Sequence, residues 1–243
     1  MPLLSNLRLL FHPRALLALA AAGFAYYARW SPLVGWSGFA VCFCAYLVSL
    51  FAQTLFPGFA RKRWLERASI DPIILAPPFE DRWYVAAGGP DRRHNHHVSV
   101  SDQYFAYDFL RDGGEAWDQP ILAPCDGMIV HVENRQPDAP PKEARRERNK
   151  PFGNYVSIQT RRGYVILAHL KAGSVSVRVG DRVRAGDVIG RCGNSGNTRG
   201  AHLHLHAQDQ PSQNVDIANG VPVAFTDRLR SEPLLLEYGD RIG

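Results

Sequence analysis

The most informative segment of the chain is Gly193-Asn194-Ser195-Gly196-Asn197-Thr198-Arg199-Gly200-Ala201-His202-Leu203-His204-Leu205-His206. Its last five residues alternate histidine with leucine, and alternate residues of an extended strand point to one face. Imidazoles on one face can meet a single metal ion. A polar strand face or a metal-scavenging tract would show the same pattern. The segment alone is therefore weak evidence for a metal site, and the rest of the chain must support it.

Other residues upstream add to this donor set. Asn95-His96-His97 is followed by Asp108, and a lone His169 lies inside an apolar run. A catalytic zinc uses three nitrogen or oxygen ligands from the protein and keeps one position open for water. The chain contains enough donors for such a site, so a zinc hydrolase is the first hypothesis.

Short apolar runs separated by Gly, Pro, Asn and Asp predict an all-β fold from about Asp71 onwards. The expected strands cover residues 121–123, 128–132, 155–159, 164–169, 188–189 and 202–207. Two Gly-Asp turns, at Gly180 and Gly186, are also found in hammerhead and lipoyl-type β folds. No lysine stands between these turns to accept lipoate or biotin, which disfavours a carrier domain.

The order of the motifs resembles the lysostaphin-type, or LytM-like, zinc endopeptidases, which cut the peptide part of bacterial peptidoglycan. The resemblance covers about Trp83 to Phe225. Its motifs are Asn95-His96-His97, Gln103 to Phe109, Ala123 to Gly127, Gly153 to Val156, Ala168-His169-Leu170, Val179 to Val183, Gly186 to Gly190, and Gly193 to Asn197 continuing through Ala201 to His204. The resemblance implies a catalytic domain built on an antiparallel sheet of the duplicated hybrid motif type.

By the same resemblance, His97, Asp108 and His204 are expected to bind zinc. His169 and His202 are expected to stay off the metal and to serve the reaction. Hydrolysis would proceed through a metal-activated water, with the two imidazoles moving its proton. Asn154 is either a polar contact for the substrate or a turn residue.

Three departures from the family pattern concern the site. The family spaces its first two ligands as H-x-x-x-D, whereas ten residues separate His97 from Asp108 here, which leaves His96 as the alternative ligand. Leu167 stands where relatives carry a tyrosine. His206 stands where they often carry an acidic residue, and we interpret it as a neighbour of a ligand in preference to a fourth ligand.

The first sixty residues differ in composition from the rest. Residues 31–60 contain no charged side chain, and about 20 apolar residues suffice to cross a bilayer. We expect a transmembrane helix over Leu33–Phe56, with a shorter apolar run at Ala15–Ala28; a cleaved signal peptide is the competing interpretation of this region. The predicted division is an anchor (1–60), a basic linker (61–76), the catalytic domain (77–228) and a tail (229–243).

Charge and cysteine content give weaker indications. The net charge of +5 fits an anionic partner, and no nucleic-acid recognition motif accompanies it. Residues 134–150 are polar and proline-rich, which predicts a mobile loop at the rim of the site. Cys125 and Cys192 could form a disulfide that stabilises by about 2–4 kcal/mol, or remain two buried thiols.

The sequence therefore predicts a zinc endopeptidase of peptidoglycan cross-links in the bacterial inner membrane, with its catalytic domain facing the periplasm or the cell exterior. Arg61, Lys62, Arg63 and Arg67 follow the expected helix, and the positive-inside rule would place this flank in the cytoplasm. Two alternatives stay open: an inactive relative that binds peptidoglycan or activates another hydrolase, and a zinc peptidase with a substrate outside the wall.

Overall fold

The computed structural model describes residues 57–211, 218–227 and 230–243, together with residues 23, 25–26, 31, 36–41 and 43–44. One compact unit runs from Lys62 to Gly243. Two helical segments accompany it, α4 (Pro57–Ala68) and the 3-10 helix η1 (His96–Ser99), and the rest of its regular structure is strand. The all-β prediction is confirmed for this unit.

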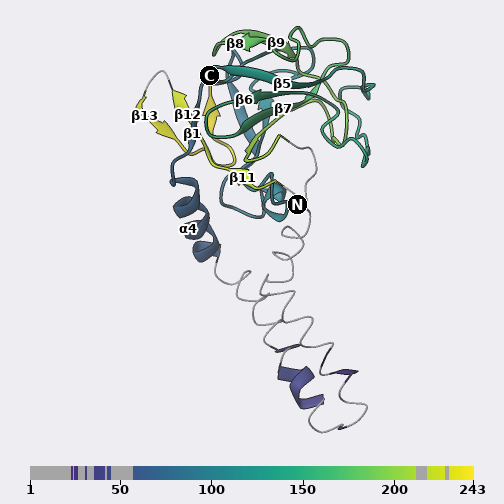
Figure 1. Cartoon of the computed structure of the whole chain (residues 1–243), viewed down its shortest axis with the longest axis vertical. Helices are drawn as coiled ribbons and strands as arrows, with labels where there is room; N and C mark the ends of the chain where they lie inside the picture. Colours follow the sequence, from purple (N-terminus) through teal and green to yellow (C-terminus); the bar gives the residue numbers. More distant parts are fainter. Residues whose placement is uncertain are drawn as a thin grey trace. The chain divides into compact units, whose positions relative to one another are not determined.

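The strands form three sheets. They are β1 (Ile73–Leu75), β2 (Trp83–Ala87), β3 (Tyr107–Arg111), β4 (Pro120–Leu122), β5 (Gly127–Glu133), β6 (Asn154–Gln159), β7 (Tyr164–Leu170), β8 (Arg182–Val183), β9 (Val188–Arg191), β10 (Leu203–Gln208), β11 (Gly220–Val221), β12 (Val223–Asp227), β13 (Arg230–Leu234) and β14 (Arg241–Ile242). The main sheet has nine strands in the order β14-β2-β3-β10-β7-β6-β5-β8, and β11 also pairs with β10. Smaller sheets join β1, β12 and β13, seen at one side in Figure 1, and β4 with β9.

Alternation along the central strands separates the hydrophobic core from the site. In β10, Leu203, Leu205 and Ala207 join the core, whereas His204 and His206 belong to the opposite face, as the period of two requires. In β3, Tyr107 and Phe109 flank Asp108 in the same way. Each large side chain buried here stabilises the fold by about 1.5–3 kcal/mol, so packing of one face fixes the other.

The six expected strands are found within one or two residues of β4, β5, β6, β7, β9 and β10. The segments expected as linker and tail contribute further elements. Trp64 of α4 is buried, with its ring centroid 5.6 Å from that of Phe105. At the other end of the chain, β14 pairs with β2. These contacts are long-range, so the composition of either segment gives no sign of them.

The expected membrane segments lie for the most part outside the described residues. Residues 36–41 and 43–44, inside the expected span Leu33–Phe56, are helical. Among the described residues, no helix has both the length and the apolar character needed to span a bilayer.

Residues 134–150 form a strap that is fastened to the segment preceding β10, contrary to the mobile loop expected from its composition. Arg145 and Thr198 exchange two backbone hydrogen bonds of 2.9 Å. The side-chain amide of Asn194 donates to the carbonyls of Pro140 and Glu143 at 2.6 and 2.8 Å. Buried polar groups on a neighbouring loop thus replace the apolar contacts that the strap lacks.

Cys125 and Cys192 are free thiols, as in the second of the two interpretations above, although only Cys192 is buried and Cys125 is half-buried. Cys192 is buried in the core, and burial raises the pKa of its thiol. Burial likewise raises the pKa of Cys125 to about 12. Both side chains are therefore protonated, unreactive components of the packing.

Candidate metal centre

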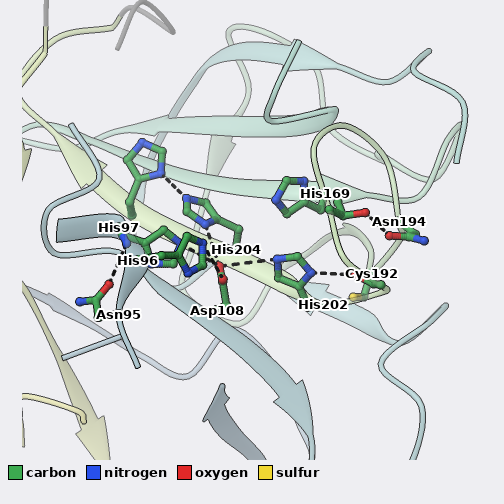
Figure 2. A network of polar contacts seen from close by, with 12 residues as sticks. Asn95, His96, His97, Asp108, His169, Cys192, Asn194, His202 and His204 are labelled. Atoms are coloured by element: carbon green, nitrogen blue, oxygen red, sulfur yellow. Dashed lines mark hydrogen bonds and ion pairs between the residues drawn. The ribbon is translucent and has the colours of Figure 1, made fainter. Parts of the chain in front are cut away.

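The carboxylate of Asp108 is the centre of the site, with the imidazole rings of several histidines around it (Figure 2). Asp108 on β3 pairs directly with His204 on β10, so the two side chains lie next to each other on one face. Asp108 Oδ1 is 2.8 Å from His204 Nδ1 and 3.3 Å from His97 Nε2. It is also 3.6 Å from His202 Nε2. The structure thus brings together four of the five residues singled out from the sequence.

The turn before β3 compensates for the wide spacing between His97 and Asp108. Asn95 caps η1: its side-chain oxygen accepts from the backbone N–H of His97 at 3.1 Å, and its amide donates to the Gly89 carbonyl at 2.6 Å. The side chain of His97 is 4% exposed. That of His96 is 67% exposed, with Nε2 3.9 Å from Asp108 Oδ2. His97 is therefore the better placed and better held of the two.

A chain of hydrogen bonds fixes the tautomer of His204. The amide nitrogen of Gln208 donates to the Gln210 carbonyl, so its oxygen accepts from His206 Nε2 at 3.0 Å. His206 Nδ1 then accepts from His204 Nε2 at 2.9 Å. The remaining His204 nitrogen, Nδ1, carries a lone pair directed at the Asp108 carboxylate.

An ionised carboxylate and a nitrogen lone pair that lie 2.8 Å apart form a pair of donors that suits a shared cation. The ligand atoms of His96, His97 and Asp108 also lie within 4.8 Å of one another. A tetrahedral zinc with bond lengths of about 2.0–2.1 Å places its ligand atoms about 3.3 Å apart, which is the spacing of His97 Nε2 and Asp108 Oδ1. His97 and Asp108 could therefore hold zinc, with His204, whose Nδ1 is 2.8 Å from Asp108 Oδ1, as the third ligand. The cluster within 4.8 Å contains His96 in place of His204, so His96 is the alternative ligand.

His169 and His202 are held in the complementary way, each by a backbone carbonyl. His169 Nδ1 donates to the Ser195 carbonyl at 2.8 Å, and His202 Nδ1 donates to the Gly200 carbonyl at 2.8 Å. A carbonyl oxygen can only accept, so each ring keeps its proton on Nδ1 and its lone pair on Nε2. The ring centroids are 4.7 Å apart. Both imidazoles can accept a proton in the groove.

A β-bulge brings His169 to the site. Strict alternation would place it with Val165 and Leu167, which face the core. The pairing of β6 with β7 skips His169, and its φ of +61° lies in the left-handed region. Bulges of this kind re-aim side chains, and strained backbone of this kind concentrates at functional positions.

The protonation states suit ligands and bases. Burial opposes ionisation of Asp108, but the nearby His97 and His202 outweigh it and hold the pKa of the carboxyl well below its usual value. Burial lowers the pKa of His204 to about 4 and that of His169 well below its usual range. For His202 the interaction with Asp108 outweighs burial and raises the pKa. The carboxylate is thus ionised while His169 and His204 are neutral, as metal binding and base catalysis require.

The structure also defines the positions of two residues discussed from the sequence, Asn154 and Leu167, and of one that the sequence analysis missed, Gln208. Asn154 is buried, and its side chain bonds to the backbone of Gln136 and Leu170, so it fastens the strap. Leu167 is packed in the core. Gln208 was missed, although it continues the alternation of positions 202, 204 and 206.

The site opens into a groove of about 1530 Å³. His97, Asp108, His169, His202 and His204 line it, together with Phe152 and parts of the strap. An antiparallel β domain with a histidine and aspartate cluster in an open groove has the features of a metal-dependent hydrolase.

Residues 112–217 match the family model described as peptidase family M23. The resemblance inferred from the motifs is thereby confirmed. The matched residues include His169, His202 and His204. His97 and Asp108 precede the match, and their place in the site comes from the geometry above.

Relatives of this chain include two curated proteins. An uncharacterized metalloprotease of Buchnera aphidicola is 29% identical over 134 residues, which cover 55% of this chain and 30% of that protein. Peptidoglycan DD-endopeptidase ShyA of Vibrio cholerae is 27% identical over 152 residues, covering 60% and 31%. The chain thus matches about a third of each relative's length. Among solved structures, the antimicrobial peptidase lysostaphin from Staphylococcus simulans is similar at 22% identity, with 58% and 46% of the two chains covered and a TM-score of 0.36.

Proposed function

We propose that this protein is a zinc-dependent endopeptidase that hydrolyses peptide cross-links of bacterial peptidoglycan. The observation that carries the proposal is the arrangement around Asp108, with His97 and His204 as ligands of the metal and two tautomer-fixed imidazoles beside them. The match of residues 112–217 to peptidase family M23 supports a peptidase. The relative named as a peptidoglycan DD-endopeptidase supports the substrate.

When bound, zinc would supply a Lewis acid and would lower the pKa of water from about 15.7 towards about 7. Residues of the chain would move the protons and stabilise the developing charge. The Nε2 lone pairs of His169 and His202 accept the proton of the attacking water, and the same imidazoles return it to the leaving amine. In its protonated form, His202 next to Asp108 stabilises the negative charge that develops on the carbonyl oxygen.

The test is the release of soluble fragments from purified peptidoglycan by the full chain in detergent, with and without a chelator. We expect chelator-sensitive release that falls by about 10²–10⁴-fold in His169→Ala, the usual loss on removing a general base. His131→Ala is the matched control, because His131 is an exposed histidine on β5 that does not line the groove.

Two outcomes would overturn the proposal. Zinc binding without release from the wall would favour a peptidase with another substrate or a protein that binds peptidoglycan. Release of fragments that persists with the chelator and in the His169→Ala variant would show that the activity needs neither a metal nor His169.

We further propose that the uncharged segment 31–60 anchors the protein in the inner membrane, with the catalytic domain on the outer side, where the polymer is. The length and composition of the segment support the anchor. A reporter that is active only outside the cytoplasm, fused after Gly243, tests the orientation. Activity of a reporter that works only in the cytoplasm, fused at the same position, would instead place the catalytic domain in the cytoplasm.

A further inference from the structure

The groove around the metal centre is strongly basic. Apart from Asp108, Glu115 is the only acidic residue among the described residues that line it. Its cationic lining residues are Arg92, Arg93, Lys142, Arg146, Arg148 and Arg199. A groove lined by one sign of charge focuses the field and concentrates ligands of the opposite sign.

Several of these cations already have partners within the protein. Arg93 forms an ion pair with Asp91 at 2.8 Å, and Lys142 pairs with Glu115 at 2.9 Å. Among the ion pairs that join described residues, none involves Arg146, Arg148 or Arg199. All three are exposed. Their guanidinium groups are therefore available to a ligand in the groove.

The backbone that carries these arginines is held in place. Arg145, next to Arg146, exchanges two backbone hydrogen bonds with Thr198, next to Arg199. The Ala201 N–H donates to the Pro141 carbonyl at 2.7 Å. The strap and the segment that leads to His202 are thus joined, so binding of a ligand requires ordering of the arginine side chains but not of the backbone that carries them.

We propose that Arg146, Arg148 and Arg199 bind free carboxylates of the substrate peptide, so that the protein selects acidic peptides over neutral bridges. A guanidinium group binds a carboxylate through two parallel hydrogen bonds, which gives orientation as well as affinity. Carboxylates on both sides of the scissile bond would align it along the groove. This inference rests on the proposed function, because it names the chemical class of substrate for that site.

The experiment compares two synthetic cross-linked peptides that differ only in whether the carboxyl groups beside the scissile bond are free or amidated. We expect the full chain to cleave the acidic peptide with a kcat/KM at least about tenfold higher, at the lower end of the contribution of a charge-assisted hydrogen bond. The double variant Arg146→Gln/Arg148→Gln and the single variant Arg199→Gln should each lose most of this preference. The difference should appear mainly in KM.

Arg161→Gln is the matched control, because Arg161 is an exposed arginine in the turn between β6 and β7, away from the groove. It should keep the preference of the wild-type protein. Raising the ionic strength from about 0.05 to about 0.5 M should reduce the preference in the wild-type protein, since screening acts on exposed charges.

The inference and the proposed function fail in different ways. Equal cleavage of the two peptides, or a preference that survives the arginine substitutions, would overturn the inference while leaving the endopeptidase intact. If neither peptide is cleaved, the proposed function is in question, and binding of the same two peptides, fluorescently labelled, to the full chain still decides the inference. Equal affinities would overturn it, and tighter binding of the acidic peptide that is lost in the arginine variants would support it.

Discussion

Replacing His206 by leucine is expected to weaken zinc binding without touching any of the three ligands. His206 is fully buried, and its Nδ1 accepts a hydrogen bond from the Nε2–H of His204 at 2.9 Å. Leucine fills much of the same volume but accepts no hydrogen bond. The ring of His204 would then be free to rotate or to exchange tautomers, and its Nδ1 would no longer be directed at Asp108 by a fixed partner.

Two quantities follow from this change. Loss of a hydrogen-bond partner behind a metal ligand typically costs 10–100-fold in metal affinity, which corresponds to about 1.4–2.7 kcal/mol. The buried N–H of His204 would also lose its partner, at about 1–3 kcal/mol of folding stability. Gln208 lies one hydrogen bond further from the metal. Gln208→Leu should therefore also reduce zinc affinity and folding stability, but by less than His206→Leu.

The assay is competition for zinc between the full chain and a chromophoric chelator, with stability of the metal-free protein measured by urea unfolding. His131→Leu, which removes a histidine outside the groove, is the control. A zinc dissociation constant within about twofold of the wild-type value in His206→Leu would refute the hydrogen-bond chain as the element that orients His204, because the expected loss is at least tenfold.

Three other predictions concern the ligand, acid stability and one glycine. Asp108→Ala should weaken zinc binding by more than about 100-fold, beyond the effect of losing an outer partner, as measured by isothermal titration; stoichiometric zinc at wild-type affinity would contradict the ligand assignment. The metal-free protein should lose stability as the pH falls from 6.5 towards about 4, because folding lowers the pKa of His204 to about 4 and the unfolded chain then binds more protons. The contribution is on the order of 3 kcal/mol, and urea unfolding of chelated protein at about pH 7 and pH 4.5 should reveal it; a flat profile would argue against it. Gly196→Ala should lower the midpoint of thermal unfolding more than Gly180→Ala does. Both glycines have a positive φ, but only at position 196 would the added methyl group collide with backbone, because it would lie 2.4 Å from the nitrogen of Gly153. Equal midpoints for the two variants would contradict this prediction.

The sequence predicts the strands best where local pattern and burial agree. The runs that became β5, β6, β7 and β10 are apolar or alternating and are bounded by turn residues, so their limits are accurate to one or two residues. By contrast, β13 (Arg230–Leu234) contains a proline and no apolar alternation, and β14 (Arg241–Ile242) has only two residues. They form because a partner strand is available, which is a property of the assembled fold.

The sequence predicted which residues form the site better than it predicted how they are arranged. Alternation predicted that His202, His204 and His206 share a face, but nothing local shows that Asp108 lies opposite His204. The choice of His97 over His96 gains support from burial and from the cap made by Asn95. The bulge that directs His169 into the groove depends on pairing with β6 and leaves no mark in the sequence.

The strap shows why composition misled. Its prolines and charges lack the apolar surface that usually orders a loop. The structure orders it through polar atoms of Asn194 and Thr198, which lie some fifty residues further along the chain. Hydrogen bonds over such separations cannot be inferred from local composition.

The alternation of core and site residues along β10 also bears on how errors in folding are excluded. A slip of β10 by one residue would turn its histidines into the core and expose Leu203 and Leu205 in the groove, because every side chain would change face. Such a state would lose the apolar packing and the metal ligands together. The proposed metal would therefore bind only chains with the correct register of β10, and its binding would stabilise those chains against unfolding.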